Sequence, residues 1–214
     1  MPEATTSAWV LLSYESPPEP PELCESLEAA REAGAHLAVI QATRPGSGGT
    51  PYRARDLTWL VRFPLPLLFV FEGELRGPWL GIALACDIRA CDATSVFDLE
   101  GVDAGAARRL EVLRCGGPGS RVTAGEAMDA GLATVNAAPG EALAEASRLA
   151  DVIASRGPIA VRLAKEAIWR GLEMPLEQAL RFETDLTLLL QTTKDRAEGV
   201  RAFLEKRRPN FTGG

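Results

Sequence analysis

Residues 73–87 read GELRGPWLGIALACD, and this stretch decides the class of fold. Its second half, residues 81–86, is made of small and apolar residues, which predicts a helix that packs closely on its neighbours. The run PLLFVF at residues 66–71 predicts a buried strand before it, and residues 87–91 begin another strand or turn. A strand, a helix and a strand in this order indicate an α/β fold.

The first half of the same stretch contains the sequence Gly77-Pro78-Trp79, which we interpret as a turn that faces a ligand. Proline has no backbone N–H. Pro78 therefore has no hydrogen bond to donate to a group that approaches this turn. The stretch combines a helix suited to close packing with a turn that has lost a donor.

The pattern continues toward the N-terminus. Residues 9–14 (WVLLSY) predict a strand, residues 23–33 a helix that ends at Gly34, and residues 37–41 (LAVIQ) a strand buried on both faces. The glycine- and proline-rich loop TRPGSGGTPYRARD follows at the carboxyl end of that strand. Ligand sites of open α/β folds lie at such ends, so this loop is a candidate for the site.

Toward the C-terminus the pattern changes at Pro139 to amphipathic helices. Apolar residues recur at helical spacing within residues 141–157, 158–174, 176–192 and 194–208. We therefore expect two parts, a core over residues 1–137 and a helical region over residues 138–214.

Composition excludes several classes of function. The net charge of −6 and the single histidine argue against a nucleic-acid binder and against a zinc site, so we expect no metal. Among the four cysteines there is no C-x-x-C pair, and Cys86 and Cys91 are expected to be small buried apolar residues. The longest apolar run is too short to span a membrane, and the first residues do not form a signal peptide. We expect a cytoplasmic protein.

Three segments together carry a family resemblance. They are GELRGPWLGIALACDIRACDATSVFDLEG at residues 73–101, RVTAGEAMDAGLA at residues 121–133, and the tail that runs from Lys165 and ends TKDRAEGVRAFLEKRRPNFTG. In this order they resemble the motifs of the crotonase (enoyl-CoA hydratase/isomerase) superfamily, and the tail is the most specific of the three. The resemblance extends from Trp9 to Gly213.

The resemblance implies a fold and a chemistry. The fold is the ClpP/crotonase-like spiral of ββα units, with C-terminal helices that build trimers, often paired into hexamers. The ligand is an acyl-CoA or acyl-carrier thioester, which is a substrate, and no further cofactor is implied. Two backbone N–H groups stabilise the thioester enolate, and carboxylates move its protons.

The residues of the oxyanion hole depart from the family pattern. The amide of Arg55 matches the first donor position, and a backbone donor survives a change of side chain. The second donor position falls on Pro78, so the amide of Trp79 is the remaining candidate. We expect the Trp79 indole to fill the pocket. The residues expected around the thioester and its CoA are Ala54, Arg55, Asp56 and Gly77.

The catalytic acids depart as well. Gly81 and Gly101 stand where hydratases of the family have two glutamates. The nearest acids are Glu100 and Asp98, and we take these two as the candidate proton carriers.

Two functions therefore remain open. The first is an enzyme that acts on an acyl thioester through an enolate, as an isomerase, decarboxylase or specialised lyase, because hydration needs two placed acids. The second is a catalytically inactive homologue that serves as a structural or regulatory partner, beside copies of itself or a paralogous subunit.

Overall fold

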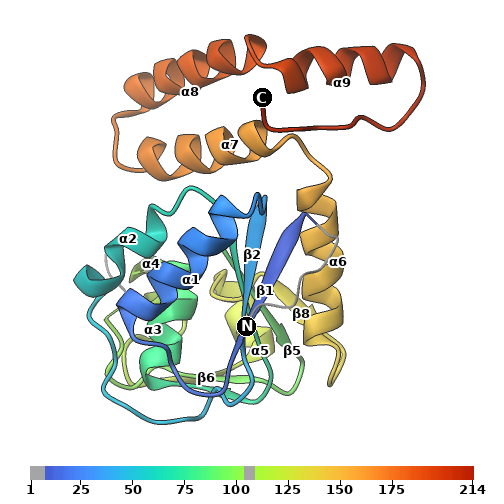
Figure 1. Ribbon diagram of the computed structural model, residues 1–214. Helices are drawn as coiled ribbons and strands as arrows, with labels where there is room; N and C mark the ends of the chain where they lie inside the picture. Colours follow the sequence, from blue (N-terminus) through green and yellow to red (C-terminus); the bar gives the residue numbers. More distant parts are fainter. Residues whose placement is uncertain (1–7, 104–108) are drawn as a thin grey trace.

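The computed structural model describes residues 8–103 and 109–214 (Figure 1). The elements follow one another as β1 Trp9–Tyr14, α1 Pro20–Glu32, β2 Leu37–Ala42, the 3₁₀ helix η1 Ala54–Leu57, α2 Thr58–Val61, β3 Leu67–Phe71, β4 Glu74–Leu75, α3 Gly77–Ala85, β5 Ile88–Asp92 and β6 Val96–Asp98. After them come α4 Arg109–Arg114, β7 Arg121–Thr123, α5 Ala124–Ala130, β8 Val135–Ala137, α6 Ala142–Ala154, α7 Pro158–Gly171, α8 Leu176–Gln191 and α9 Lys194–Leu204.

A five-stranded parallel sheet with the order β1-β2-β3-β5-β8 forms the centre of the core. Strands β2 and β3 consist almost entirely of apolar residues, as expected for a parallel sheet that is covered on both faces. All five residues of β3, LLFVF, are buried. The strands predicted at residues 9–14, 37–41 and 66–71 are therefore confirmed to within one residue.

The two faces of the sheet pack against different helices. On one face Val39, Leu68 and Val70 contact α6, which presents Ala142, Ala146 and Ala150. Alanines spaced by four residues lie on one side of a helix and let it approach the sheet closely. On the other face the alternate residues of the same strands pack against α1, α3 and α5.

A second, smaller sheet has the order β4-β6-β7. The chain passes from β3 of the large sheet to β4 of the small sheet and then into α3, and it passes again from β5 to β6. This alternation builds the ββα units that the family resemblance implies.

Helix α3 begins earlier than the sequence predicts. The expected start at Gly81 is wrong, since Gly77, Pro78 and Trp79 form the first turn of α3, with Arg76 as the N-cap. Proline is favoured in a first helical turn because its missing N–H would have no intrahelical acceptor there. Gly77 has a positive φ of 58°, which a residue with a side chain rarely adopts.

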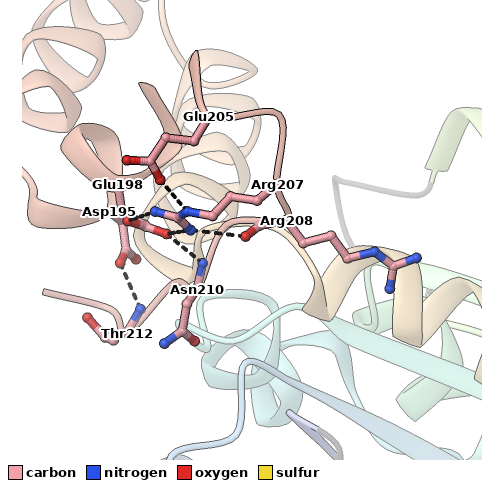
Figure 2. A network of polar contacts seen from close by, with 7 residues as sticks. All are labelled: Asp195, Glu198, Glu205, Arg207, Arg208, Asn210 and Thr212. Atoms are coloured by element: carbon pink, nitrogen blue, oxygen red, sulfur yellow. Dashed lines mark hydrogen bonds and ion pairs between the residues drawn. The ribbon is translucent and has the colours of Figure 1, made fainter. Parts of the chain in front are cut away.

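The C-terminal helices divide into two groups. Helix α6 lies along the large sheet, whereas α7, α8 and α9 form a separate layer beyond one end of the strands (Figure 1). After the end of α9 the chain reverses direction and runs back along this helix (Figure 1). In this segment the Arg207 guanidinium donates hydrogen bonds to the carboxylates of Glu198 and Glu205 (Figure 2). The buried carboxylate of Asp195 accepts the amide of Thr212 at 2.7 Å, so the returning chain is fixed to α9.

Candidate active site

The two expected oxyanion donors lie in the first turns of neighbouring helices. Arg55 is the second residue of η1, and Trp79 is the third residue of α3. Amides in these positions have no intrahelical acceptor. Helix η1 packs against α3, so the tertiary structure brings the two elements together. The side chains of these two residues differ in burial, since that of Trp79 is buried and that of Arg55 is exposed.

The Trp79 indole is fully buried. Its ring centre lies 5.9 Å from that of Phe69, and its Nε1–H donates a hydrogen bond to the Ser47 hydroxyl at 2.9 Å. The indole therefore belongs to the hydrophobic core, and the expectation that it fills the ligand pocket stays a prediction. The indole also joins α3 to the glycine-rich loop, a contact that the sequence analysis did not foresee.

The Arg55 side chain lies on the surface. Its Nε is 3.6 Å from the Asp56 carboxylate, and both side chains are exposed. The neighbouring amide of Ala54 donates to the Asp103 carboxylate at 2.9 Å. The exposed carboxylate of Asp103 is thus the acceptor at the first residue of the segment expected to contact the thioester.

The candidate proton carriers lie at the end of β6. Glu100 is exposed, whereas Asp98 is buried and accepts the amide of Glu100 at 3.1 Å. Gly101, which stands at the expected acid position, has a positive φ of 66°. The Asp98 carboxylate therefore fixes the turn that carries Glu100.

A polar cluster that the sequence analysis missed connects the core to α7. The Asp87 carboxylate accepts from the Lys165 ammonium at 2.7 Å, from the Trp169 indole at 3.0 Å and from the Leu67 amide at 2.8 Å. Lys165 also donates to the carbonyl oxygen of Leu65 at 2.8 Å. Lys165 and Trp169 are four residues apart, which places them on one side of α7. This four-residue spacing is the feature of the sequence from which a shared contact of Lys165 and Trp169 could have been predicted.

Two clefts lie beside that cluster, and both include Lys165 and Trp169 in their walls. The first has a volume of about 800 Å³ and runs between residues 61–64 and α7. The second has a volume of about 660 Å³ and is lined mostly by apolar side chains of α4, α6 and α7. None of the expected oxyanion or acid residues lines either cleft.

No helix within residues 8–103 and 109–214 is long and apolar enough to cross a membrane. The His, Cys, Asp and Glu side chains of the same ranges form no group of three or more that could hold a metal ion.

Comparison with known proteins places the chain in a family. A family model for enoyl-CoA hydratase/isomerase matches residues 112–214. The protein YngF of Bacillus subtilis (strain 168), named for the enoyl-CoA hydratase/isomerase family, is 38% identical over 172 residues, which are 74% of this chain and 66% of that protein. The 2,3-dehydroadipyl-CoA hydratase of Escherichia coli (strain K12) is 32% identical over 167 residues, which are 72% of this chain and 66% of that protein.

The fold agrees with solved structures. The crystal structure of enoyl-CoA hydratase subunit I from Geobacillus kaustophilus HTA426 superposes with a TM-score of 0.82 at 25% identity, covering 99% of this chain and 97% of that one. The chain spans 56% of the curated relative from Arabidopsis thaliana and 66% of the one from B. subtilis. These relatives and the fold agree with the motifs at residues 73–101, 121–133 and in the tail. The chain belongs to the crotonase (enoyl-CoA hydratase/isomerase) superfamily.

Proposed function

We propose that this chain is a non-catalytic subunit of the crotonase superfamily, which acts as a structural or regulatory partner. The observation that carries the proposal is the pair of glycines at the positions of the two catalytic acids. Gly81 lies in the middle of α3 and Gly101 in the turn after β6. The nearest carboxylates do not replace them, since Glu100 is exposed and Asp98 is bound to the Glu100 amide.

The enolate chemistry of the family needs positioned acids and two oxyanion donors, and this chain lacks several of these groups. A general acid or base must lie within hydrogen-bond reach of the proton that it moves. An oxyanion hole needs donors aimed at the developing charge, and loss of one donor lowers the rate by about 10²–10³-fold. Pro78 supplies no donor. These losses support a role without turnover.

The exposed side chains of the helical layer support a role in assembly. Leu172, Leu176, Phe203 and Leu204 are each more than 70% exposed. Leu172 and Leu176 lie at the turn between α7 and α8, and Phe203 and Leu204 lie at the end of α9. Large exposed apolar side chains indicate surfaces that associate with another protein. We propose that α7–α9 bind further copies of this chain or a paralogous subunit, as a trimer or hexamer.

A second candidate function is enolate chemistry on an acyl-CoA or acyl-carrier thioester, as an isomerase or decarboxylase. The observation in its favour is that the Arg55 and Trp79 amides lie in the first turns of two helices that pack together. Such amides are suitable donors to a developing negative charge. In this function Glu100 or Asp98 moves the proton, and the CoA thioester is the substrate.

Turnover decides between the two. Purified protein is assayed for hydration of crotonyl-CoA and for isomerisation of a 3-enoyl-CoA, with Glu100→Gln prepared in parallel. The non-catalytic proposal expects no turnover above a blank without protein. Turnover that falls in Glu100→Gln would establish the second candidate, and turnover equal in both would remove Glu100 from the mechanism.

Assembly is tested by sedimentation velocity. The wild-type chain is expected to sediment as an oligomer, and the change Phe203→Asp to shift it to a smaller species. The control is Gln178→Asp, which changes an exposed polar residue of α8. A wild-type monomer at all concentrations would contradict the assembly role.

A further inference from the structure

The cleft of about 800 Å³ between residues 61–64 and helix α7 is a second candidate site, and we name it the α7 cleft. Lys165 and Trp169 in its wall bind Asp87, which lies just beyond the C-terminal end of α3. The amide of Trp79 lies in the first turn of α3. The helix has nine residues and is therefore about 13 Å long. The α7 wall of the cleft and this expected oxyanion donor thus lie at opposite ends of α3.

One side of α7 forms a continuous wall of the cleft. Its lining residues are separated from the first of them by three, four, seven and eleven positions, which places them on the same side of the helix. They are Arg162, Lys165, Glu166, Trp169 and Glu173. Residues 61–64, directly before the buried strand β3, form the facing wall. Side chains of two different elements therefore converge on one space.

The cleft has two aromatic rings that are already held in place. The Phe63 side chain is buried, and its ring stands edge-on to that of Trp59, with the ring centres 6.4 Å apart. The Trp169 indole N–H donates to the Asp87 carboxylate at 3.0 Å. A planar ring that enters the cleft therefore meets aromatic surfaces whose ordering costs little on binding.

The charge of the cleft is positive, although the whole chain has a net charge of −6. Lys165 is paired with Asp87 at 2.7 Å, and Arg170 is paired with Glu166 at 3.0 Å. Within residues 8–103 and 109–214 no salt bridge includes the two remaining cations, and Glu173 is the remaining acid. These cations are Arg62 in the wall of residues 61–64 and Arg162 in the α7 wall. Each wall thus brings one guanidinium group without a carboxylate partner.

We propose that the α7 cleft binds a planar aromatic anion, which is a ring system that carries a phosphate or a carboxylate group. A guanidinium group binds either anion through paired N–H donors, and Arg62 and Arg162 supply two such groups. Phe63 and Trp169 contact the ring. The volume of the cleft falls within the range of about 300–1,000 Å³ that is typical of small-molecule sites. The inference goes beyond the proposed function and holds whether or not the chain turns over a thioester.

Binding is tested by calorimetric titration of the wild-type protein with AMP, as the phosphate ligand, and with 2-naphthoate, as the carboxylate ligand. At least one of them should saturate with a Kd below about 1 mM, the weak end of the affinity scale. Adenosine lacks the anion and inorganic phosphate lacks the ring, so each should bind at least about tenfold more weakly than AMP if the phosphate ligand is the one bound. No saturable binding of either ligand would overturn the proposal.

Two variants assign the binding to the α7 cleft. Arg62→Gln and Arg162→Gln should each raise the Kd about tenfold or more, because a hydrogen bond to a charged group is worth at least about that factor. Both side chains are exposed, so the fold should tolerate the changes. The matched control is Arg148→Gln in α6, an exposed arginine that pairs with Glu145 outside the cleft, and its Kd should equal that of the wild type. An unchanged Kd in both cleft variants, or an equal loss in the control, would overturn the assignment.

Competition separates the α7 cleft from a thioester site. The titration is repeated in the presence of excess CoA, and the Kd of the aromatic anion should not change. Displacement by CoA would make the cleft part of a thioester site and would overturn the inference. The turnover assay is independent of this result, so failure of the inference leaves both candidate functions standing.

Discussion

Trp79 and Ser47 are joined by a hydrogen bond of 2.9 Å from the indole N–H to the hydroxyl oxygen, and this bond ties helix α3 to the glycine-rich loop that covers it. The indole is fully buried against Phe69. A buried indole N–H needs an acceptor, and here the loop supplies it.

This bond should give a measurable coupling energy. Ser47→Ala removes the acceptor and is expected to lower the free energy of unfolding by about 1 kcal/mol. Trp79→Phe removes the donor and also leaves a void, so it should cost more, about 2–3 kcal/mol. In urea unfolding the double variant should cost less than the sum of the single variants, by about 1 kcal/mol. Full additivity would show that the two side chains do not interact.

The ion pair between Lys165 and Asp87 should matter more than a surface pair. Both side chains are largely buried, and the Asp87 carboxylate also accepts from Leu67 and Trp169. Lys165→Met leaves a buried carboxylate without its cation and is expected to cost about 3 kcal/mol. The control is Arg148→Met, since the Arg148–Glu145 pair is exposed, and it should cost under about 1 kcal/mol. Similar losses in the two variants, measured at one protein concentration, would contradict this.

Acid should weaken the C-terminal network of Figure 2. The Arg207 guanidinium and the Asn210 amide lower the pKa of Glu198 from 4.5 to about 2. A carboxyl with a lowered folded-state pKa stabilises the fold above its unfolded pKa, and this contribution is lost as pH falls. The wild type should therefore exceed Glu198→Gln in thermal stability at pH 7, and the difference should shrink between about pH 4.5 and pH 2.

The comparison of the wild type with Glu198→Gln separates the effect of the Glu198 carboxyl from that of other carboxyls that titrate in the same pH range. The pKa values of Asp92 and Glu126 are also lowered, in each case with help from hydrogen bonds to the carboxylate. Their contributions are common to the wild type and the variant and cancel in the difference. A difference in melting temperature that stays constant from pH 7 to pH 2 would contradict the prediction.

The buried thiol of Cys91 should be unreactive in the native protein. Burial, assisted by the charge of Asp92, raises its pKa to about 12. The thiolate is the nucleophile, and at pH 8 only about one Cys91 in ten thousand carries it. Iodoacetamide should modify the half-buried Cys24 first. Cys91 should react only after unfolding in urea, and its labelling in the native state would contradict the prediction.

The sequence by itself determined the family, the buried strands and the helical tail. Apolar runs such as residues 66–71 predicted strands covered on both faces, and helical periodicity predicted α6–α9. These are local patterns, and hydrophobic burial acts on them in the same way in most contexts. The sequence also identified Pro78 as a missing donor, because that property belongs to the residue itself.

Only the tertiary structure decided what the altered residues contact. The sequence predicted a ligand-facing turn at Gly77-Pro78-Trp79, but in the fold these residues form the first turn of α3, which packs against the backbone of Gly49. It also did not connect Asp87 with Lys165, because 78 positions separate them and no periodicity spans that distance. Contacts between distant segments depend on how whole elements pack, which local patterns do not encode. In the same way, only the structure shows that Gly81 lies against Leu57 and Tyr52 and that Gly101 lies against Pro51.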